Sequence, residues 1–376
     1  MILDGLLSLL NGFGNLQWSQ GVMILVGCGL LYLGIKKNME PLLLIPIGFG
    51  AILVNIPLAG MMEKEGLLRY FYEAGVLTEI FPCLIFIGIG AMTDFGPLLE
   101  NPRILLLGGA GQFGIFLTLL LALALGFTKL EAVAIGIIGA CDGPTAIYVT
   151  SKYAPHMLGA VSVAAYCYMS LVPIIQPPIM RALTTVEERK IVMTYKKKSI
   201  SSSVKVLFPI AVTLVTCLIA PMGTPLMGTL MLGNLLRESG VADRLVKASQ
   251  NEIANIVTLL LGISIGATMA GPVFLKAETL IILGLGLLAI SLDTAMGIFL
   301  AKLMKILSGG KVNPLIGAAG ISAFPMSARV VQAEGQKANK KNYLLMYAMG
   351  ANTGGQIGSV LAAAVMLSLL KGMGVV

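Results

Sequence analysis

Charged residues are scarce in this sequence, and this scarcity limits the class of protein. They make up 12% of the chain, whereas hydrophobic residues make up 57% and the mean hydropathy is +0.90. A soluble domain carries roughly one-quarter charged residues, so the composition excludes one. Apolar runs such as 104–127 and 280–301 reach the ~20 residues that a helix needs to cross a bilayer. We therefore predict an all-α polytopic membrane protein.

Metal-binding motifs are also missing. The chain has one histidine and five cysteines without a CxxC pair, which predicts buried thiols and no metal cluster. The net charge is +8, but the basic residues gather in loops, so they indicate membrane topology and not nucleic-acid binding. The loop 181–205 holds seven basic residues against two acidic ones, and the positive-inside rule places it in the cytoplasm. It is either a topogenic signal or a dock for an acidic partner, and both readings stay open.

The apolar runs divide the chain into four parts. We predict an N-terminal interfacial helix at 1–19, a first transmembrane repeat at 20–180, a basic cytoplasmic linker at 181–205 and a second transmembrane repeat at 206–376. An amphipathic helix is expected within 61–79. Spans are expected near 20–35, 40–57, 80–92, 103–127, 130–149 and 157–180, and again near 206–222, 225–236, 253–270, 277–306, 313–333 and 343–370.

A pattern of glycine and proline recurs in the two halves. The motif IGxxGxxxxP at 135–144 returns at 316–325, 181 positions later. Upstream, IGIGA at 87–91 with a following Gly-Pro returns as ISIGA at 263–267, again followed by Gly-Pro. Two matched pairs in the same order indicate an internal repeat.

Both copies of the longer motif interrupt an apolar helix. A break at membrane depth frees backbone groups, which is tolerated only where they line a protein cavity or bind something. Interrupted helices at corresponding positions of two halves are typical of transporters built from inverted repeats. We therefore expect two repeats whose discontinuous helices aim at a shared site near the membrane midplane. Inverted repeats would need an odd number of crossings in each half, and the sequence leaves this open.

Polar residues lie in or beside these breaks. Asp142 lies in the first, and because a charge at membrane depth is costly we expect it to be functional; a carboxylate paired only for packing is the alternative. Asn313, Gly317 and Ser322 lie on the second broken segment. Neutral oxygen ligands with one carboxylate suit a hard monovalent cation such as Na⁺.

Four further polar residues each have two possible roles. Arg329 lies about two helical turns past Ser322, where it either faces the same cavity or holds the cytoplasmic end of a span. Tyr168 either offers a hydroxyl to a cavity or packs between helices. Asn352 serves ligand binding or a helix-to-helix hydrogen bond equally well. Asp293, a second deep acid, is either a proton carrier or a paired structural charge.

Four segments together carry a resemblance to a known family: GACDGPT at 139–145, NPLIG at 313–317, GISAFPMSARV at 320–330 and GANTGG at 350–355. They resemble the β-subunit of the biotin-dependent, sodium-pumping decarboxylases. That family serves oxaloacetate, methylmalonyl-CoA and glutaconyl-CoA decarboxylases. The resemblance extends over nearly the whole chain.

The resemblance implies a decarboxylase and an ion pump in one chain. In the family, a soluble carboxyltransferase α-subunit loads a biotin carrier, and the β-subunit decarboxylates the carboxybiotin, exports Na⁺ and consumes a proton from the far side. By the same resemblance, Asp142, Tyr168 and Arg329 are catalytic, Tyr168 and Arg329 bind carboxybiotin, and the Na⁺-linked residues are Asp142, Asn313, Gly317, Ser322 and Asn352.

The resemblance also implies an assembly. The family has an elevator-like architecture with scaffold and core domains, a small γ or δ membrane subunit and a trimeric β core. It lies in the bacterial or archaeal cytoplasmic membrane. Biotin is expected on a partner, because the only Met-Lys pair, Met304-Lys305, ends an apolar span where no carrier domain forms.

The residue chemistry suits this reaction. Carboxybiotin is an anion that Arg329 would hold, and its leaving nitrogen must regain a proton, which Tyr168 or a carboxyl would relay. We expect Na⁺ to bind between Asp142 and the Ser322 segment and to displace the proton used. The alternative is a Na⁺/H⁺ antiporter or a Na⁺-coupled carboxylate carrier without catalysis, and the acyl substrate stays open.

Overall fold

The computed structural model describes residues 11–195 and 199–375, and every regular element within them is a helix, as predicted. Residues 1–10 of the predicted interfacial helix lie outside the described residues. The first half comprises α2 Asn11–Gly14, α3 Trp18–Lys36, α4 Pro41–Val54, α5 Leu67–Phe71, η1 Tyr72–Val76, α6 Ile80–Met92, α7 Gly96–Glu100, η2 Pro102–Ile104, α8 Leu105–Ala110, α9 Phe113–Ala124, α10 Lys129–Gly136, η3 Ile137–Ala140, α11 Gly143–Tyr153, η4 Pro155–Met157 and α12 Leu158–Leu183.

The second half follows a short connecting helix, α13 Val186–Lys190. It comprises α14 Ser202–Ile219, η5 Pro221–Gly223, α15 Thr224–Ser239, α16 Asp243–Ala248, η6 Ser249–Ile253, α17 Ala254–Ala267, α18 Gly271–Phe274, α19 Ala277–Leu307, η7 Pro314–Gly320, α20 Met326–Ala338 and α21 Leu345–Gly372.

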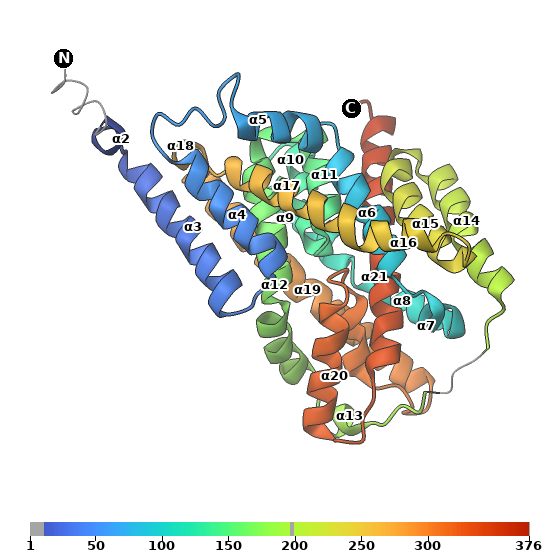
Figure 1. Ribbon diagram of the computed structural model, residues 1–376. Helices are drawn as coiled ribbons and strands as arrows, with labels where there is room; N and C mark the ends of the chain where they lie inside the picture. Colours follow the sequence, from blue (N-terminus) through green and yellow to red (C-terminus); the bar gives the residue numbers. More distant parts are fainter. Residues whose placement is uncertain (1–10, 196–198, 376) are drawn as a thin grey trace, which may run out of the picture.

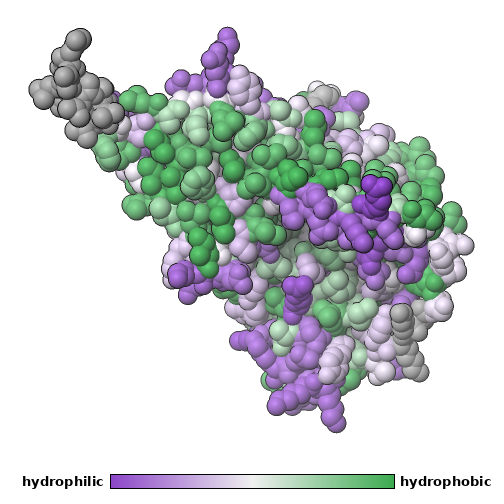
Figure 2. Space-filling view, in the orientation of Figure 1, coloured by the Kyte–Doolittle hydropathy of each residue, from purple (hydrophilic) through white to green (hydrophobic). Residues whose placement is uncertain are grey.

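The multi-pass prediction is confirmed. Within the described residues, six helical segments are long and apolar enough to cross a membrane, and a bent pair, Leu67–Val76 with Ile80–Met92, makes up to seven. Only 6% of the apolar window of α14 is buried, so this helix presents its side chains outward. Figure 2 shows hydrophobic surface over α3 and α4 and hydrophilic surface around α13 and α20.

The order of elements is the same in the two halves. Each half has a helix pair (α3–α4, α14–α15), a short helix extended by a π-helical turn, an apolar helix (α6, α17), a long apolar segment (α8–α9, α19), a broken segment and a last long helix (α12, α21). Helices of one half pack on those of the other, α4 on α17 and α6 on α15. A Cβ atom on Gly50 would lie 2.4 Å from the Ile263 oxygen, and one on Gly90 would lie 1.9 Å from the Leu230 oxygen. These two helix pairs therefore meet backbone to backbone.

The two interrupted spans of the prediction are hairpins instead, because each returns to the end of the molecule from which it starts. In hairpin 1, residues 129–153, Glu131 near the start pairs with His156 just beyond the end, Oε1 to Nε2 at 2.9 Å. In hairpin 2, residues 313–338, the flanking amides of Asn313 and Asn342 both donate to the Arg189 oxygen at 3.0 Å. Hairpin 1 lies in the upper part of Figure 1 and α20 of hairpin 2 in the lower part.

The predicted span at 103–127 is confirmed as the candidate span Pro102–Ala124, although it is not one uninterrupted helix. The helix breaks at Gly111-Gln112, between α8 and α9. A Cβ atom on Gly111 would lie 2.4 Å from the Gly320 oxygen of hairpin 2. The break lets the backbone approach the tip of that hairpin.

Candidate functional site

The tips of the two hairpins touch each other inside the protein. Hairpin 1 turns at residues 141–142 and hairpin 2 at 321–325. The Ser322 N–H donates to the Ala140 oxygen at 3.1 Å, which joins the tips directly. The sequence prediction that both breaks aim at one shared place is therefore confirmed.

Asp142 is the residue at which hairpin 1 turns. It precedes α11 as its N-cap, with Pro144 in the first turn, and its carboxylate accepts from the Thr145 N–H at 3.4 Å. Asp142 thus lies at the positive end of the helix dipole. The carboxylate also accepts from the Thr145 hydroxyl at 2.7 Å and the Ser359 hydroxyl at 3.0 Å. It is 7% exposed, and no lysine or arginine of residues 11–195 and 199–375 forms an ion pair with it.

A cavity of about 500 Å³ lies beside the hairpin tips. Asp142, Ser322 and Arg329 all line it, together with Tyr166 and residues of α4, α6 and α17. The structure therefore brings the side chains of Asp142, Ser322 and Arg329 to one cavity. A carboxylate and an arginine facing one cavity provide sites for a cation and for an anion, respectively.

Asn352 holds the tip of hairpin 2 from behind. Its amide nitrogen donates to the Ile321 oxygen at 2.6 Å, while its amide oxygen is buried without a partner. The Ser322 hydroxyl donates to the Gly355 oxygen at 2.8 Å, on the same helix, α21. This amide oxygen is fully buried and does not line the cavity.

The structure does not bring Asn313 and Gly317 to the tips. Asn313 lies at the mouth of hairpin 2, where its side-chain oxygen accepts from the Leu315 N–H at 3.0 Å. Its side-chain nitrogen donates to the backbone oxygens of Arg189 in α13 and of Ile191 just after it. Gly317 packs on α19, since a Cβ atom there would lie 2.0 Å from the Gly297 oxygen. Their contacts cap and pack the hairpin.

Tyr168 points away from the cavity. Its hydroxyl donates to the Leu283 oxygen on α19, and its ring packs over Gly286. Tyr166, two residues earlier on α12, lines the cavity instead. The contacts of Tyr168 fit the helix-packing alternative, and its role in catalysis stays a prediction. Both tyrosines stand in one apolar run, and nothing in the run marks which face is inward.

Three further polar residues at the site were missed by the sequence reasoning: Thr145 and Ser359 bond to Asp142, and Gln356 lines the cavity. Thr145 had a signal, because a hydroxyl three residues after an N-cap acid is well placed to contact it. Ser359 and Gln356 had none, since they reach the site from α21, more than two hundred positions further along the chain. Only tertiary packing places them there.

Asp293, the second deep acid, lies behind hairpin 1 and does not line the cavity. It is 0% exposed, and one carboxylate oxygen accepts from the Gly114 N–H at the start of α9. The other oxygen has no partner, and no basic side chain in the described part of the chain pairs with it. The structure therefore shows no basic partner for Asp293 among the described residues. Its carboxylate instead caps the first turn of α9, beyond the break between α8 and α9.

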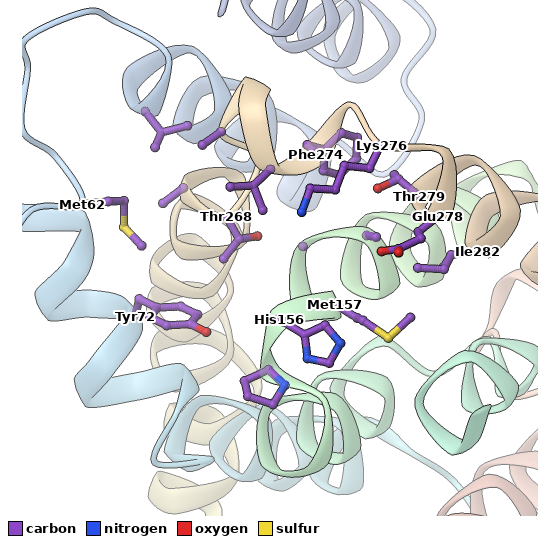
Figure 3. A pocket seen from close by; sticks show the side chains of 17 residues that line it. Met62, Tyr72, His156, Met157, Thr268, Phe274, Lys276, Glu278, Thr279 and Ile282 are labelled. Atoms are coloured by element: carbon purple, nitrogen blue, oxygen red, sulfur yellow. The ribbon is translucent and has the colours of Figure 1, made fainter. Parts of the chain in front are cut away.

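A second cavity, of about 400 Å³, lies at the end where hairpin 1 opens. Figure 3 shows His156, Tyr72, Thr268, Lys276 and Glu278 around it. Three helices, α4, α12 and α17, line both cavities at different heights. Between these heights lie buried apolar side chains, among them Ile47, Val163, Leu261 and Ile265.

The mouth of hairpin 2 is surrounded by charge. Arg181 binds Glu334 of α20 through two contacts of 2.8 and 2.9 Å. Glu188 of α13 lies within 3.2 Å of Lys302 and 3.0 Å of Lys305. Burial alone would raise the pKa of Glu188, but the Thr185 N–H and the two lysines outweigh it and lower this pKa to about 2. We call this end of the molecule the basic end.

Comparison with known proteins adds independent findings. Residues 19–370 match the family described as Na⁺-transporting oxaloacetate decarboxylase beta subunit. The chain is 52% identical to the methylmalonyl-CoA decarboxylase subunit beta of Propionigenium modestum, over 96% of this chain and 97% of that protein. It is 53% identical to the glutaconyl-CoA decarboxylase subunit beta of Acidaminococcus fermentans, over 96% of each chain, and 46% identical to the oxaloacetate decarboxylase beta chain of Klebsiella pneumoniae, over 99% and 100%.

Proposed function

Because this chain belongs to the family of membrane β-subunits of the Na⁺-transporting, biotin-dependent decarboxylases, we propose that its central cavity is where carboxybiotin is decarboxylated and Na⁺ is bound. Membership in this family decides against the secondary transporter without catalysis that the sequence left open. The observation that carries the proposal is that Asp142, Ser322 and Arg329 line one cavity at two touching hairpin tips.

Each substrate has a matching set of residues. Na⁺, the cargo, prefers oxygen ligands. Asp142 and Ser322 line the cavity, and the unpaired amide oxygen of Asn352 lies behind the tip of hairpin 2, outside the cavity lining. Arg329 is the cavity residue that suits the carboxylate of carboxybiotin. A cation beside Asp142 and an anion beside Arg329 would also attract each other across the cavity, which couples occupancy of the two sites.

We infer that the two halves are inverted repeats that alternate access to this site. The support is the matched order of elements, the reciprocal packing of α4 on α17 and α6 on α15, and hairpins that enter from opposite ends. Two cavities lie along α4, α12 and α17, separated by an apolar layer. An elevator-like movement of the hairpins past these helices would transfer Asp142 from one cavity to the other.

The basic end faces the cytoplasm in this proposal. It carries basic residues of four elements, among them Arg181, Arg189, Lys190, Lys305 and Lys337. The positive-inside rule assigns such an end to the cytoplasm. The cavity beside Asp142 extends to Glu40, close after Lys36 and Lys37, so it opens toward this side.

The proposed partners follow from the family resemblance. Carboxybiotin must arrive on a soluble carrier loaded by a carboxyltransferase α-subunit, and we propose that both dock at the basic end. A small γ or δ membrane subunit and a trimeric β core complete the proposed assembly in the cytoplasmic membrane of a prokaryote. The β-subunits of the acyl-CoA decarboxylases are 52% and 53% identical to this chain, against 46% for that of oxaloacetate decarboxylase, which favours an acyl-CoA substrate for the α-subunit.

Replacing Asp142 tests the function. With the complex reconstituted in vesicles, Asp142→Asn should abolish both Na⁺-stimulated decarboxylation and Na⁺ uptake, because an amide cannot balance the charge of a dehydrated cation. Asp142→Glu should retain part of each activity. Full activity of Asp142→Asn would refute the proposal.

A further inference from the structure

Asp293 of α19 is a buried acid of which only one carboxyl oxygen has a hydrogen-bond partner. The side chain is 0% exposed; Oδ1 accepts from the Gly114 N–H, and Oδ2 is unpaired. No lysine, arginine or histidine among residues 11–195 and 199–375 forms an ion pair with it. An ionised carboxylate buried without a cation is so costly that the group takes up a proton instead. A neutral carboxyl group has one O–H donor, and this donor needs an acceptor.

The unpaired oxygen faces the backbone of hairpin 1 just before its turn. A Cβ atom on Gly139 would lie 3.1 Å from Oδ2 of Asp293, so η3 packs directly against this carboxyl group. The neighbouring backbone oxygens of Ile138 and Ala140 each accept a hydrogen bond from an N–H group. The oxygen of Gly139, a buried residue, has no donor within the described ranges. An acceptor without a donor and a carboxyl oxygen without a partner therefore meet where hairpin 1 contacts α19.

The internal repeat contains a counterpart of this contact in which the hydrogen bond is complete. The offset of 181 positions relates Gly139 to Gly320, and it relates Gln112 to Asp293. The side-chain nitrogen of Gln112 donates to the Gly320 oxygen at 3.3 Å, which joins the α8–α9 break to hairpin 2. A primary amide and a protonated carboxyl group both combine an acceptor oxygen with a donor, so either can make this bond.

We propose that Asp293 is a neutral carboxylic acid whose O–H group donates to the Gly139 oxygen and holds hairpin 1 against α19, as Gln112 holds hairpin 2. The same carboxyl group accepts from the Gly114 N–H, so it joins α9, α19 and hairpin 1. Asp142 follows Gly139 by three residues, so this bond positions the acid at the hairpin tip. Asp293 is thus a positioning residue, and its effect on decarboxylation rests on the proposed function of Asp142.

The test compares Asp293→Asn with Asp293→Leu in the reconstituted complex. Asparagine keeps an oxygen for the Gly114 N–H and an N–H donor for the Gly139 oxygen, so the decarboxylation rate and the half-saturating Na⁺ concentration should stay within about 2-fold of the wild type. Leucine has a similar size but neither group. Because it leaves two buried backbone groups unpaired, Asp293→Leu should lower the melting temperature and reduce the Na⁺-stimulated rate roughly 10-fold. Asp142→Asn is the matched control, since it makes the same substitution at the other deep acid and should be inactive.

Infrared spectroscopy tests the protonation of Asp293 directly. The wild-type spectrum minus that of Asp293→Asn at pH 7 should contain the C=O stretching band of a protonated carboxyl group, and carboxylate bands in its place would overturn the inference. A folded but inactive Asp293→Asn would also overturn it, because the charge itself would then be needed, as in a cation ligand or a proton carrier. Equal rates and melting temperatures of Asp293→Asn and Asp293→Leu would overturn it as well.

The two proposals fail in different ways. If Asp142→Asn and Asp293→Asn are both active while Asp293→Leu is not, the proposed function fails and the bond to hairpin 1 stands. If Asp142→Asn and Asp293→Asn are both folded and inactive, the inference fails and the proposed function stands.

Discussion

Gly317 offers a sharp test of the packing argument, because sequence and structure suggest different roles for it. The family resemblance links Gly317 to Na⁺, whereas in the structure it touches α19. A Cβ atom on Gly317 would lie 2.0 Å from the Gly297 oxygen, and one on Gly297 would lie 2.1 Å from the Gly317 oxygen. We predict that Gly317→Ala acts through this contact.

The size of the effect follows from the distances. Real Cβ atoms essentially never approach another atom more closely than 3.0 Å, so hairpin 2 and α19 must separate by about 1 Å. The obstructing atom belongs to the backbone, which cannot rotate aside as a side chain can. Overpacking of this kind costs about 1–3 kcal/mol. Gly317→Ala should therefore lower the thermal stability of the purified complex and reduce decarboxylation at every Na⁺ concentration.

The control is Gly284→Ala on the same helix, α19, where an added Cβ atom meets nothing within 4 Å. Its stability should equal that of the wild type or exceed it slightly, since alanine favours a helix over glycine. Thermal unfolding and Na⁺ titration of the decarboxylation rate measure both variants. Wild-type stability of Gly317→Ala together with a raised half-saturating Na⁺ concentration would refute the packing argument and support a direct role in Na⁺ binding.

Two further predictions follow from the contacts of the site and of the basic end. Ser359→Ala removes a hydroxyl donor from the Asp142 carboxylate. A hydrogen bond to a charged group contributes about 1.5 kcal/mol, so the half-saturating Na⁺ concentration should rise roughly 10-fold. An unchanged Na⁺ titration would contradict a role of the Ser359–Asp142 hydrogen bond in Na⁺ binding. The pKa of Glu188 is lowered from 4.5 to about 2, so its stabilising effect is fully present above pH 4.5 and is lost as the pH falls toward 2. The difference in free energy of unfolding between wild type and Glu188→Gln should therefore be constant from pH 7 to 5 and decrease below pH 5. A difference that already decreases between pH 7 and 5 would argue against the Lys302 and Lys305 contacts.

The two broken segments show how much of the site the glycine and proline pattern predicts. Glycine and proline at matched positions predict two interruptions aimed at one place, and Ser322 and Ala140 do touch there. The same pattern reads equally as a kinked span or as a hairpin, because both have one break between two apolar pieces. Contacts such as Glu131 with His156 decide for the hairpin, and these join residues that no local signal pairs.

The sequence by itself determined the class of protein, the two breaks and the acid at the first of them. These are properties of composition and local spacing: scarce charge excludes a soluble domain, and an aspartate after a glycine-rich turn caps the helix that follows. Only the tertiary structure decided which polar groups reach that acid. Ser359 arrives from the last helix, Tyr166 and not Tyr168 faces the cavity, and Asn313 stays at the hairpin mouth. The physical reason is that an apolar membrane helix carries little periodic contrast between its faces, so the face that turns inward is set by packing against distant helices.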